Sequence, residues 1–208
     1  MIGDIMGISR YRMATDGMGV STLVVFYDCP LRCKYCINSK CLERNKHLYE
    51  ETERAAYTPK ELIDILRKDE IYYLMTKGGV VFGGGEPLLQ SHFIHEVCKL
   101  ADKRWVKRIE TSLNVPWRLI EPLIDDIDEW IIDIKAGNTK EYEDYTGQSF
   151  EDVSRNLYRM RDLIPKSKFR IRVPYIEGYT SEEAVKANLK WVESLLDVKG
   201  ETFDYYIP

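Results

Sequence analysis

Residues 21–36 have the sequence STLVVFYDCPLRCKYC, in which an apolar run leads directly into a loop with three cysteines. The first part, Ser21–Tyr27, is rich in Val and Phe, which is typical of a strand buried on both faces of a parallel sheet. The cysteines follow where that strand ends. Because functional sites in α/β folds lie at the carboxyl ends of the strands, this stretch predicts both a parallel sheet and a site at its edge.

Further apolar runs repeat the pattern along the chain. They predict strands at Gly79–Phe82, Val106–Thr111, Glu129–Ile134, Phe169–Val173 and Thr202–Ile207. Helices are expected from capping boxes at Thr58 and Thr180, the second ending near Gly200, and at about 91–103, 116–125, 140–145 and 151–163. Six strand–helix units, the last without its helix, predict an α/β fold with a parallel sheet. A full eight-stranded barrel needs about 250 residues, so we expect a partial (β/α)6 TIM-like barrel or an open sheet.

The length and composition fit one globular domain. We expect a single domain over residues 1–208, with a lead-in at 1–20 and the partial barrel at 21–208. The formal net charge of −4 gives no general basic field for nucleic acid. No apolar run approaches the roughly 18 residues of a membrane span. Asp4 stands where a signal peptide has Lys or Arg, so we expect a cytoplasmic protein with no membrane partner.

The five cysteines are unevenly placed, at Cys29, Cys33, Cys36, Cys41 and Cys98. An odd number in a cytoplasmic chain does not predict a disulfide framework. The C-x3-C-x2-C spacing favours an iron–sulfur cluster in which three cysteines hold three irons and leave the fourth without a protein ligand. A zinc site completed by Cys41 and an incidental thiol cluster are the alternatives. Cys98 lies in an apolar helix, which predicts a core thiol.

Two motifs carry a family resemblance. Cys29-x3-Cys33-x-Tyr35-Cys36 resembles the signature of the radical S-adenosylmethionine (radical SAM) superfamily, and Gly84-Gly85-Glu86-Pro87 resembles its GGEP motif. The resemblance implies a [4Fe–4S] cluster whose open iron binds S-adenosylmethionine (SAM). Reductive cleavage of SAM then gives methionine and a 5′-deoxyadenosyl radical.

Within that superfamily the chain is most similar to the activating enzymes of glycyl radical enzymes. The similar segments are Asp16–Gly19, Cys29–Asn38, Asp133–Lys135 and Arg172–Thr180. This resemblance implies hydrogen abstraction from a glycine of a partner glycyl radical enzyme, in anaerobic metabolism, with a flavodoxin or ferredoxin-type electron donor. A radical SAM enzyme acting on a small molecule or peptide, such as a 7-carboxy-7-deazaguanine synthase-like enzyme, is the alternative. A zinc-binding, non-enzymatic module is the third.

The resemblance also implies roles for individual residues. Cys29, Cys33 and Cys36 would hold the cluster, while Tyr35 would face the adenine and Asn38 would bond near the cluster. The methionyl ammonium would meet Gly83, Gly84, Gly85 and Glu86. Lys135 would hold the SAM carboxylate, and Asp133 would assist through a bound monovalent cation, grouped with Glu110 and Thr111. Arg172, with Arg170 as its competitor, would bind a carboxylate or a ribose hydroxyl.

Overall fold

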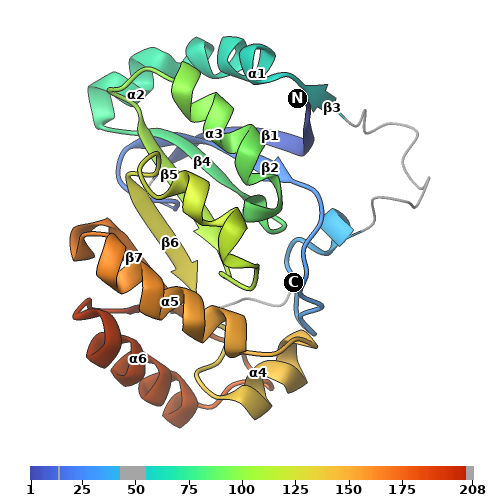
Figure 1. The fold of residues 1–208 in the computed structure, drawn as a ribbon, viewed down its shortest axis with the longest axis vertical. Helices are drawn as coiled ribbons and strands as arrows, with labels where there is room; N and C mark the ends of the chain where they lie inside the picture. The colour runs from blue at the N-terminus through green and yellow to red at the C-terminus, as the bar shows by residue number, and fades with distance from the viewer. Residues whose placement is uncertain (14, 43–54, 205–208) are drawn as a thin grey trace.

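The computed structural model describes residues 1–13, 15–42 and 55–204. They form one sheet in the order β3-β1-β2-β4-β5-β6-β7-β8 (Figure 1). The strands are β1 (Gly3–Met13), β2 (Val20–Phe26), β3 (Ala55–Tyr57), β4 (Gly79–Gly84), β5 (Val106–Thr111), β6 (Glu129–Asp133), β7 (Phe169–Tyr175) and β8 (Glu201–Asp204). Every neighbouring pair from β2 to β8 is parallel, which confirms the predicted parallel sheet.

Two antiparallel strands, β1 and β3, were not predicted. β1 pairs with β2 and carries the short β3 on its other side. Its sequence, GDIMGISRYRM, contains two glycines and three charged residues and no apolar run. A β-bulge lies between Ser9 and Arg12, with Tyr11 in the left-handed region at φ 59°. These irregularities hide the strand from a search for alternating or continuous apolar residues.

The helices pack on the outer face of the sheet. They are α1 (Pro59–Leu66), α2 (Glu70–Thr76), α3 (Ser91–Leu100), α4 (Thr139–Thr146), α5 (Glu151–Leu163) and α6 (Glu182–Leu196). The capping box at Thr58 is confirmed: its hydroxyl accepts from the Glu61 amide, and the Glu61 carboxylate accepts from the Thr58 amide. In the described residues, no helix is both long enough and apolar enough to cross a bilayer.

Three predicted helix boundaries are wrong. The N-cap of α6 is Ser181 rather than Thr180, whose hydroxyl instead accepts from the Ile176 amide in the preceding turn. The same helix ends at Leu196, where Asp197 adopts the left-handed conformation, and does not continue to Gly200. The segment at 116–125 forms two separate 3-10 turns, because Pro122 has no amide hydrogen to continue a helix.

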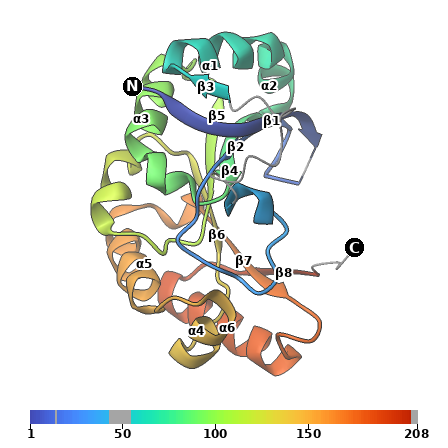
Figure 2. The same ribbon diagram turned by 90° about the vertical axis from the view of Figure 1, so that its right-hand side faces the viewer.

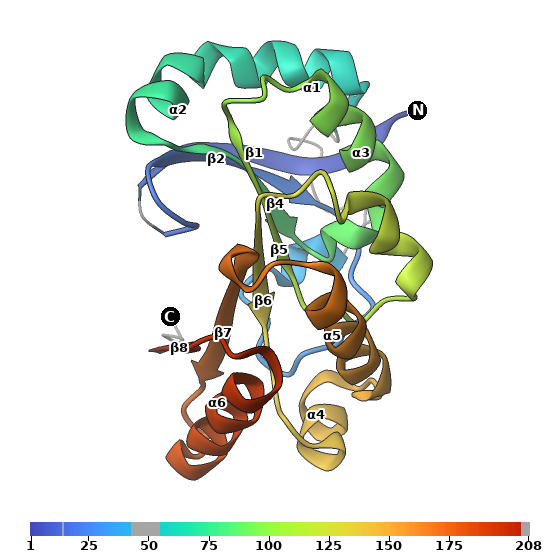
Figure 3. The same ribbon diagram turned by 60° about the vertical axis from the view of Figure 1, so that its left-hand side comes forward.

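The sheet is curved, and its two faces differ. Figures 2 and 3 show the α-helices gathered along the outer side, whereas no α-helix of the described residues lies over the concave side. The outer-facing side chains of the central strands are fully buried, among them Val24, Phe82, Ile109, Ile132 and Ile171. The concave face and the carboxyl edge therefore remain available for a site.

Candidate active site

The three cysteines of the motif lie on one loop after β2, residues 29–36, which we call the cysteine loop. Cys29, Cys33 and Cys36 are all partly exposed and free of disulfides. The last turn of α4 holds the loop through its backbone: the Arg32 amide donates to the Thr146 carbonyl at 2.8 Å, and the Lys34 amide donates to the Tyr145 carbonyl at 3.0 Å. The loop is therefore fixed by a helix that lies more than 100 residues later in the chain.

Burial is the main influence on the pKa values of Cys29 and Cys33. Burial raises the pKa of Cys29 to about 12, and the nearby Glu86 carboxylate adds to the shift. Burial likewise raises the pKa of Cys33, although the charge of Lys135 opposes the shift. Because the thiolate is the form that binds iron, the metal itself must supply the compensating positive charge.

The donor set fits a multi-iron cluster better than a single ion. Among residues 1–13, 15–42 and 55–204, no three His, Cys, Asp or Glu side chains are arranged to hold one metal ion. In a [4Fe–4S] cluster each thiolate binds a different iron, so the three sulfurs need not converge on one point. Cys41, which would complete a zinc site, is buried, and its Sγ lies 3.7 Å from the sulfur of Met6. Burial raises the pKa of Cys41 to about 11, and the charge of Cys36 adds to the shift, so Cys41 lies near the cysteine loop and the iron content is what separates the two kinds of site.

Residues Gly83–Glu86, which we call the glycine turn, lie at the end of β4 and pack directly on the residues that lead into the cysteine loop. The Gly85 amide donates to the Phe26 carbonyl, and the Glu86 amide donates to the Asp28 carbonyl at 2.8 Å. A Cβ at Gly85 would lie only 2.2 Å from the Asp28 carbonyl oxygen, and Gly84 has φ +99°. Glycine is therefore required here by the close approach of the two loops.

Asn38, predicted to bond near the cluster, connects the same two loops. Its side-chain amide donates to the Gly84 carbonyl at 3.1 Å. The bond joins the chain just after Cys36 to the turn that the resemblance assigns to the methionyl ammonium.

The carboxylate of Glu86 is buried and accepts hydrogen bonds from the protein itself. It is 1% exposed and accepts from the Thr111 hydroxyl (2.7 Å), the Ser112 amide (3.0 Å) and the Ser112 hydroxyl (2.7 Å). Burial raises its pKa even though these bonds oppose the shift. Thr111 is thereby bound to Glu86, and because successive residues of a strand point to opposite faces, it does not group with Glu110.

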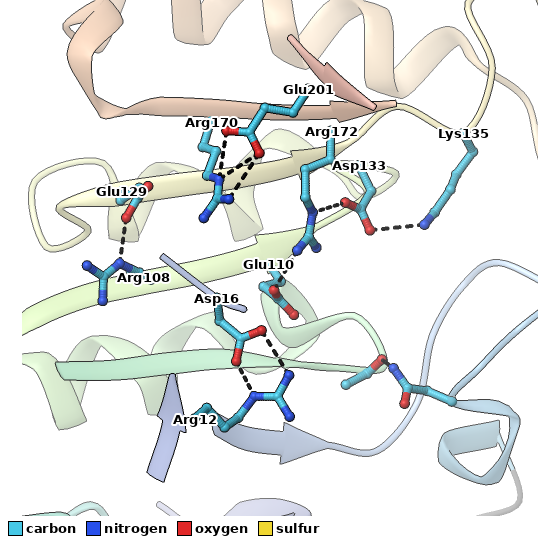
Figure 4. Close-up of polar contacts among 12 residues, drawn as sticks. Arg12, Asp16, Arg108, Glu110, Glu129, Asp133, Lys135, Arg170, Arg172 and Glu201 are labelled. Carbon is cyan, nitrogen blue, oxygen red and sulfur yellow. Dashed lines mark hydrogen bonds and ion pairs between the residues drawn. The ribbon is translucent and has the colours of Figure 1, made fainter. Parts of the chain in front are cut away.

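Four charged side chains meet on the concave face near the carboxyl edge, as Figure 4 shows. They are Glu110, Asp133, Lys135 and Arg172, and we call them the concave charge group. Arg172 Nε donates to Asp133 Oδ1 at 2.7 Å, and its Nη1 donates to Glu110 Oε1 at 2.9 Å. Lys135 Nζ donates to Asp133 Oδ2 at 3.0 Å. Burial alone would raise the pKa of Asp133, but the charges of Lys135 and Arg172 outweigh it and lower the pKa. Burial raises the pKa of Glu110, although Arg172 opposes the shift.

This arrangement does not fit the monovalent cation that the resemblance implies. Both oxygens of Asp133 already accept from cationic side chains, and the Thr111 hydroxyl lies with Glu86 on the other side of the strand. Within the described residues, the three expected oxygen donors are therefore not gathered around one point.

Further ion pairs cover the rest of the concave face (Figure 4). They are Arg12–Asp16, Arg108–Glu129 and Arg170–Glu201. Arg170, the competitor of Arg172, thus pairs with β8 rather than with the central group. The sequence analysis missed this lining as a whole. Its signal is the alternate placing of Arg108 and Glu110 in VKRIET (106–111), and of Arg170 and Arg172 in FRIRV (169–173).

The sequence of this chain is similar to those of several activating enzymes. The 4-hydroxyphenylacetate decarboxylase activating enzyme of Clostridioides difficile (strain 630) is 31% identical over 154 residues, which cover 73% of this chain and 48% of that protein. The isethionate sulfite-lyase activating enzyme of Oleidesulfovibrio alaskensis is 23% identical over 260 residues, covering 98% and 84%. The chain thus spans about half the length of the first of these relatives.

Solved structures support the same fold. A domain of a pyruvate-formate lyase-activating enzyme from Bacteroides vulgatus matches with a TM-score of 0.50 and 25% identity, over 60% of this chain and 76% of that one. Streptococcus suis SuiB matches with a TM-score of 0.64 over 88% of this chain and 38% of that one, but at 16% identity it supports the fold alone. The predicted partial barrel is therefore confirmed.

The family model described as "Radical SAM superfamily" matches residues 23–188, which is most of the chain and includes the cysteine loop, the glycine turn and all four residues of the concave charge group. As the two motifs predict, this chain belongs to the radical SAM superfamily of enzymes.

Proposed function

We propose that this protein activates a glycyl radical enzyme. With a [4Fe–4S] cluster and SAM bound, reductive cleavage supplies a 5′-deoxyadenosyl radical, which takes a hydrogen atom from a glycine of the partner and leaves as 5′-deoxyadenosine. The electron comes from a flavodoxin or ferredoxin-type donor in the cytoplasm. Sequence similarity over most of the chain to proteins named as activating enzymes supports this function.

The observation that carries the proposal is the packing of the cysteine loop against the glycine turn. The three thiols directly follow Phe26 and Asp28, whose carbonyls accept from the Gly85 and Glu86 amides at the carboxyl edge. In the proposal Cys29, Cys33 and Cys36 hold the cluster. The backbone of Gly83–Glu86 faces the methionyl ammonium, and the ring of Tyr35 lies on the adenosine side.

The concave charge group supplies the other half of the proposed site. Lys135 is the side chain nearest the carboxyl edge, and it holds the SAM carboxylate. Arg172 binds Glu110 and Asp133, and so keeps Asp133 in place to orient Lys135. The two cationic side chains balance the two carboxylates, so the proposal needs no monovalent cation. The protein's part is to bind, orient and exclude water, because the cofactor supplies the reactive species.

The test is anaerobic. The reconstituted protein is mixed with dithionite, SAM and a candidate glycyl radical enzyme chosen from the neighbouring genes, and electron paramagnetic resonance (EPR) is recorded. We expect a glycyl radical doublet on the partner together with 5′-deoxyadenosine, and neither with Cys33→Ala. If 5′-deoxyadenosine forms while the partner carries no radical, and a small molecule is consumed instead, the activating function is wrong.

A further inference from the structure

The short helix α2 presents apolar side chains to solvent. Its sequence, EIYYLMT, is apolar between its two end residues, yet only Tyr73 of it is buried. A surface helix normally turns its apolar stripe toward the core, whereas Ile71, Tyr72 and Met75 are exposed here. The packing of the fold therefore does not account for the apolar character of this helix.

The end of β1 and the loop that follows it lie beside α2 and enlarge this surface (Figure 3). The rings of Tyr11 and Tyr72 meet edge to face, with their centroids 5.4 Å apart. The Val20 amide donates to the Thr76 hydroxyl at 2.8 Å, and Val20 is opposite Met13 in the sheet register. We call the combined surface the methionine patch; its side chains are 46–80% exposed and are those of Tyr11, Met13, Met18, Ile71, Tyr72 and Met75.

The composition of the methionine patch is typical of a protein interface. Methionine and tyrosine are enriched at interfaces relative to the rest of a protein surface. The flexible thioether of methionine adapts to irregular partner surfaces. A contiguous group of exposed apolar side chains, unlike a single one, marks an interaction site. The methionine patch therefore indicates a binding surface.

The rim of the methionine patch is positively charged. Lys68 precedes α2 and Lys77 follows it, and both are exposed. The neighbouring acids are engaged by the protein itself, since Asp69 accepts from Arg10 and Glu70 accepts from an indole N–H at 3.1 Å. The partner should therefore present acidic groups around an apolar centre. A second copy of this chain fits poorly, because two identical positive rims would face each other.

The methionine patch borders the concave face of the sheet. Arg108 donates to the Met18 carbonyl at 3.0 Å and pairs with Glu129 in the lining of that face (Figure 4). Asp16, two residues before Met18, pairs with Arg12 in the same lining. A protein seated on the patch therefore lies beside the face on which the proposed radical chemistry takes place.

The same position separates the methionine patch from the cysteine loop. The patch lies at the Val20 end of β2, whereas the cysteines follow Phe26 at the other end. At about 3.3 Å per residue, this strand alone spans roughly 20 Å. An electron donor must approach the cluster closely, so it does not suit this place. The protein substrate suits both the charge and the position.

We propose that the methionine patch docks the protein substrate of this enzyme, which meets it with apolar side chains framed by acidic ones. The inference rests on the proposed function insofar as the radical acts on a glycine of a protein. It gives the enzyme a docking surface apart from the cluster and SAM. The affinity for the substrate protein can therefore change while SAM cleavage does not.

The test measures binding without turnover. The cluster-reconstituted protein is titrated, without SAM, with the candidate glycyl radical enzyme of the activation test. The double variant Ile71→Asp/Met75→Asp should bind about tenfold or more weakly than wild type. Lys68→Glu should slow association and reduce its dependence on salt. A double variant that binds within twofold of wild type, including the case in which neither binds, overturns the inference.

Two variants at distant exposed positions are the matched controls. Leu163→Asp, at the end of α5, places the same charge on an exposed apolar residue outside the patch. Lys166→Glu, in the turn after α5, makes the same charge change as Lys68→Glu. Both should bind within twofold of wild type. A loss for Leu163→Asp as large as that for the double variant would show a general effect of negative charge and overturn the inference.

Further measurements separate docking from folding and from other occupants. The altered side chains are exposed, so the melting temperature should stay within about 3 °C of wild type, and 5′-deoxyadenosine formation without the partner should be unchanged. Loss of this partner-free SAM cleavage in the double variant would assign the patch a structural role. A dimer, or binding to phosphatidylserine vesicles, that the double variant abolishes would assign it another occupant. Each of these results overturns the inference.

Failure of the docking surface and failure of the proposed function give different results. If wild type binds the candidate through the patch but leaves no radical on it, the docking surface stands and the proposed function is wrong. If the radical forms and the double variant has an unchanged KM for the partner, the proposed function stands and the docking inference is wrong.

Discussion

The hydroxyl of Tyr145 donates a 2.8 Å hydrogen bond to the carbonyl oxygen of Tyr35, the residue between the second and third cysteines of the cysteine loop. The two residues are 110 positions apart in the sequence. Together with the two backbone bonds from the last turn of α4, this contact makes the helix a clamp on the loop. The position of Cys33 and Cys36 therefore depends on a helix that contributes no ligand.

Tyr145→Phe should alter the cluster without removing it. We expect the iron content to be retained, the EPR spectrum of the reduced cluster to change and the KM for SAM to rise, because the loop between the two cysteines loses its side-chain anchor. The stability loss should be about 1 kcal/mol.

Tyr142→Phe is the matched control for this variant. Tyr142 lies on the same helix and is buried, and its hydroxyl accepts from the Asn114 amide at 3.1 Å rather than donating to the backbone of the cysteine loop. Its loss should lower stability by a similar amount, about 1 kcal/mol, and leave the EPR spectrum unchanged. Equal spectra for the two variants would contradict the clamp.

The Cys→Ser variants should fall into two groups by the iron content of the reconstituted protein. Ser at Cys29, Cys33 or Cys36 should prevent assembly of a stable cluster, whereas Cys41→Ser and Cys98→Ser should keep about four irons per chain, as a single [4Fe–4S] cluster requires. Chemical iron analysis after anaerobic reconstitution checks this. Loss of iron in Cys41→Ser would show that the buried thiol is a ligand after all.

Much of this architecture could be predicted because its signals are local. Ser21–Tyr27 and the other parallel strands are apolar runs, and the capping box at Thr58 lies within four residues. The cysteine loop and the glycine turn are contiguous motifs. Each depends on residues close together in the sequence, so the sequence alone predicts it.

The features that were missed depend on contacts between distant segments. β1 is stabilised by pairing with β2 and β3, not by an apolar pattern of its own. Thr111 was grouped with Asp133, but its hydroxyl donates instead to Glu86 in the turn after β4. The ion pairs on the concave face join residues on neighbouring strands, whose register is known only once the sheet is built.

Changing Arg172 to Met should lower the free energy of unfolding much more than changing Arg170 to Met. Arg172 joins two carboxylates that are only 18% and 15% exposed, so Arg172→Met should cost about 3 kcal/mol by leaving them unpaired, and should raise the KM for SAM by displacing Lys135. Arg170 pairs with Glu201, whose side chain is 53% exposed, so Arg170→Met should cost no more than about 1 kcal/mol. Urea unfolding and SAM-cleavage kinetics measure the two effects.

A double variant tests the cause of the larger loss. Adding Glu110→Gln to Arg172→Met removes one of the stranded charges and should recover part of the stability. A purely additive loss would mean that the ion pair between these two residues contributes little.

Ionised Asp69 should contribute to the free energy of unfolding, and this contribution should be lost in acid. Its side chain is 1% exposed and accepts from the Arg10 guanidinium, with Nε at 2.8 Å, and from the Thr22 hydroxyl at 2.9 Å. Burial alone would raise the pKa of Asp69, but Arg10 and Thr22 outweigh it and lower the pKa. An acid whose pKa is lowered by folding stabilises the protein above its ordinary pKa of about 3.9, and this contribution is lost as the pH falls through the lowered value.

Asp69→Asn should therefore lower the free energy of unfolding by about 2 kcal/mol at pH 7. The difference in this free energy between the variant and wild type, the gap, should narrow as the pH falls below about 4. Asp64→Asn on α1, with a side chain that is 57% exposed, is the control and should change stability little at any pH. Urea unfolding across this pH range makes the comparison, and a gap for Asp69→Asn that stays constant down to pH 3 would show that the ionised carboxylate is not what stabilises this region.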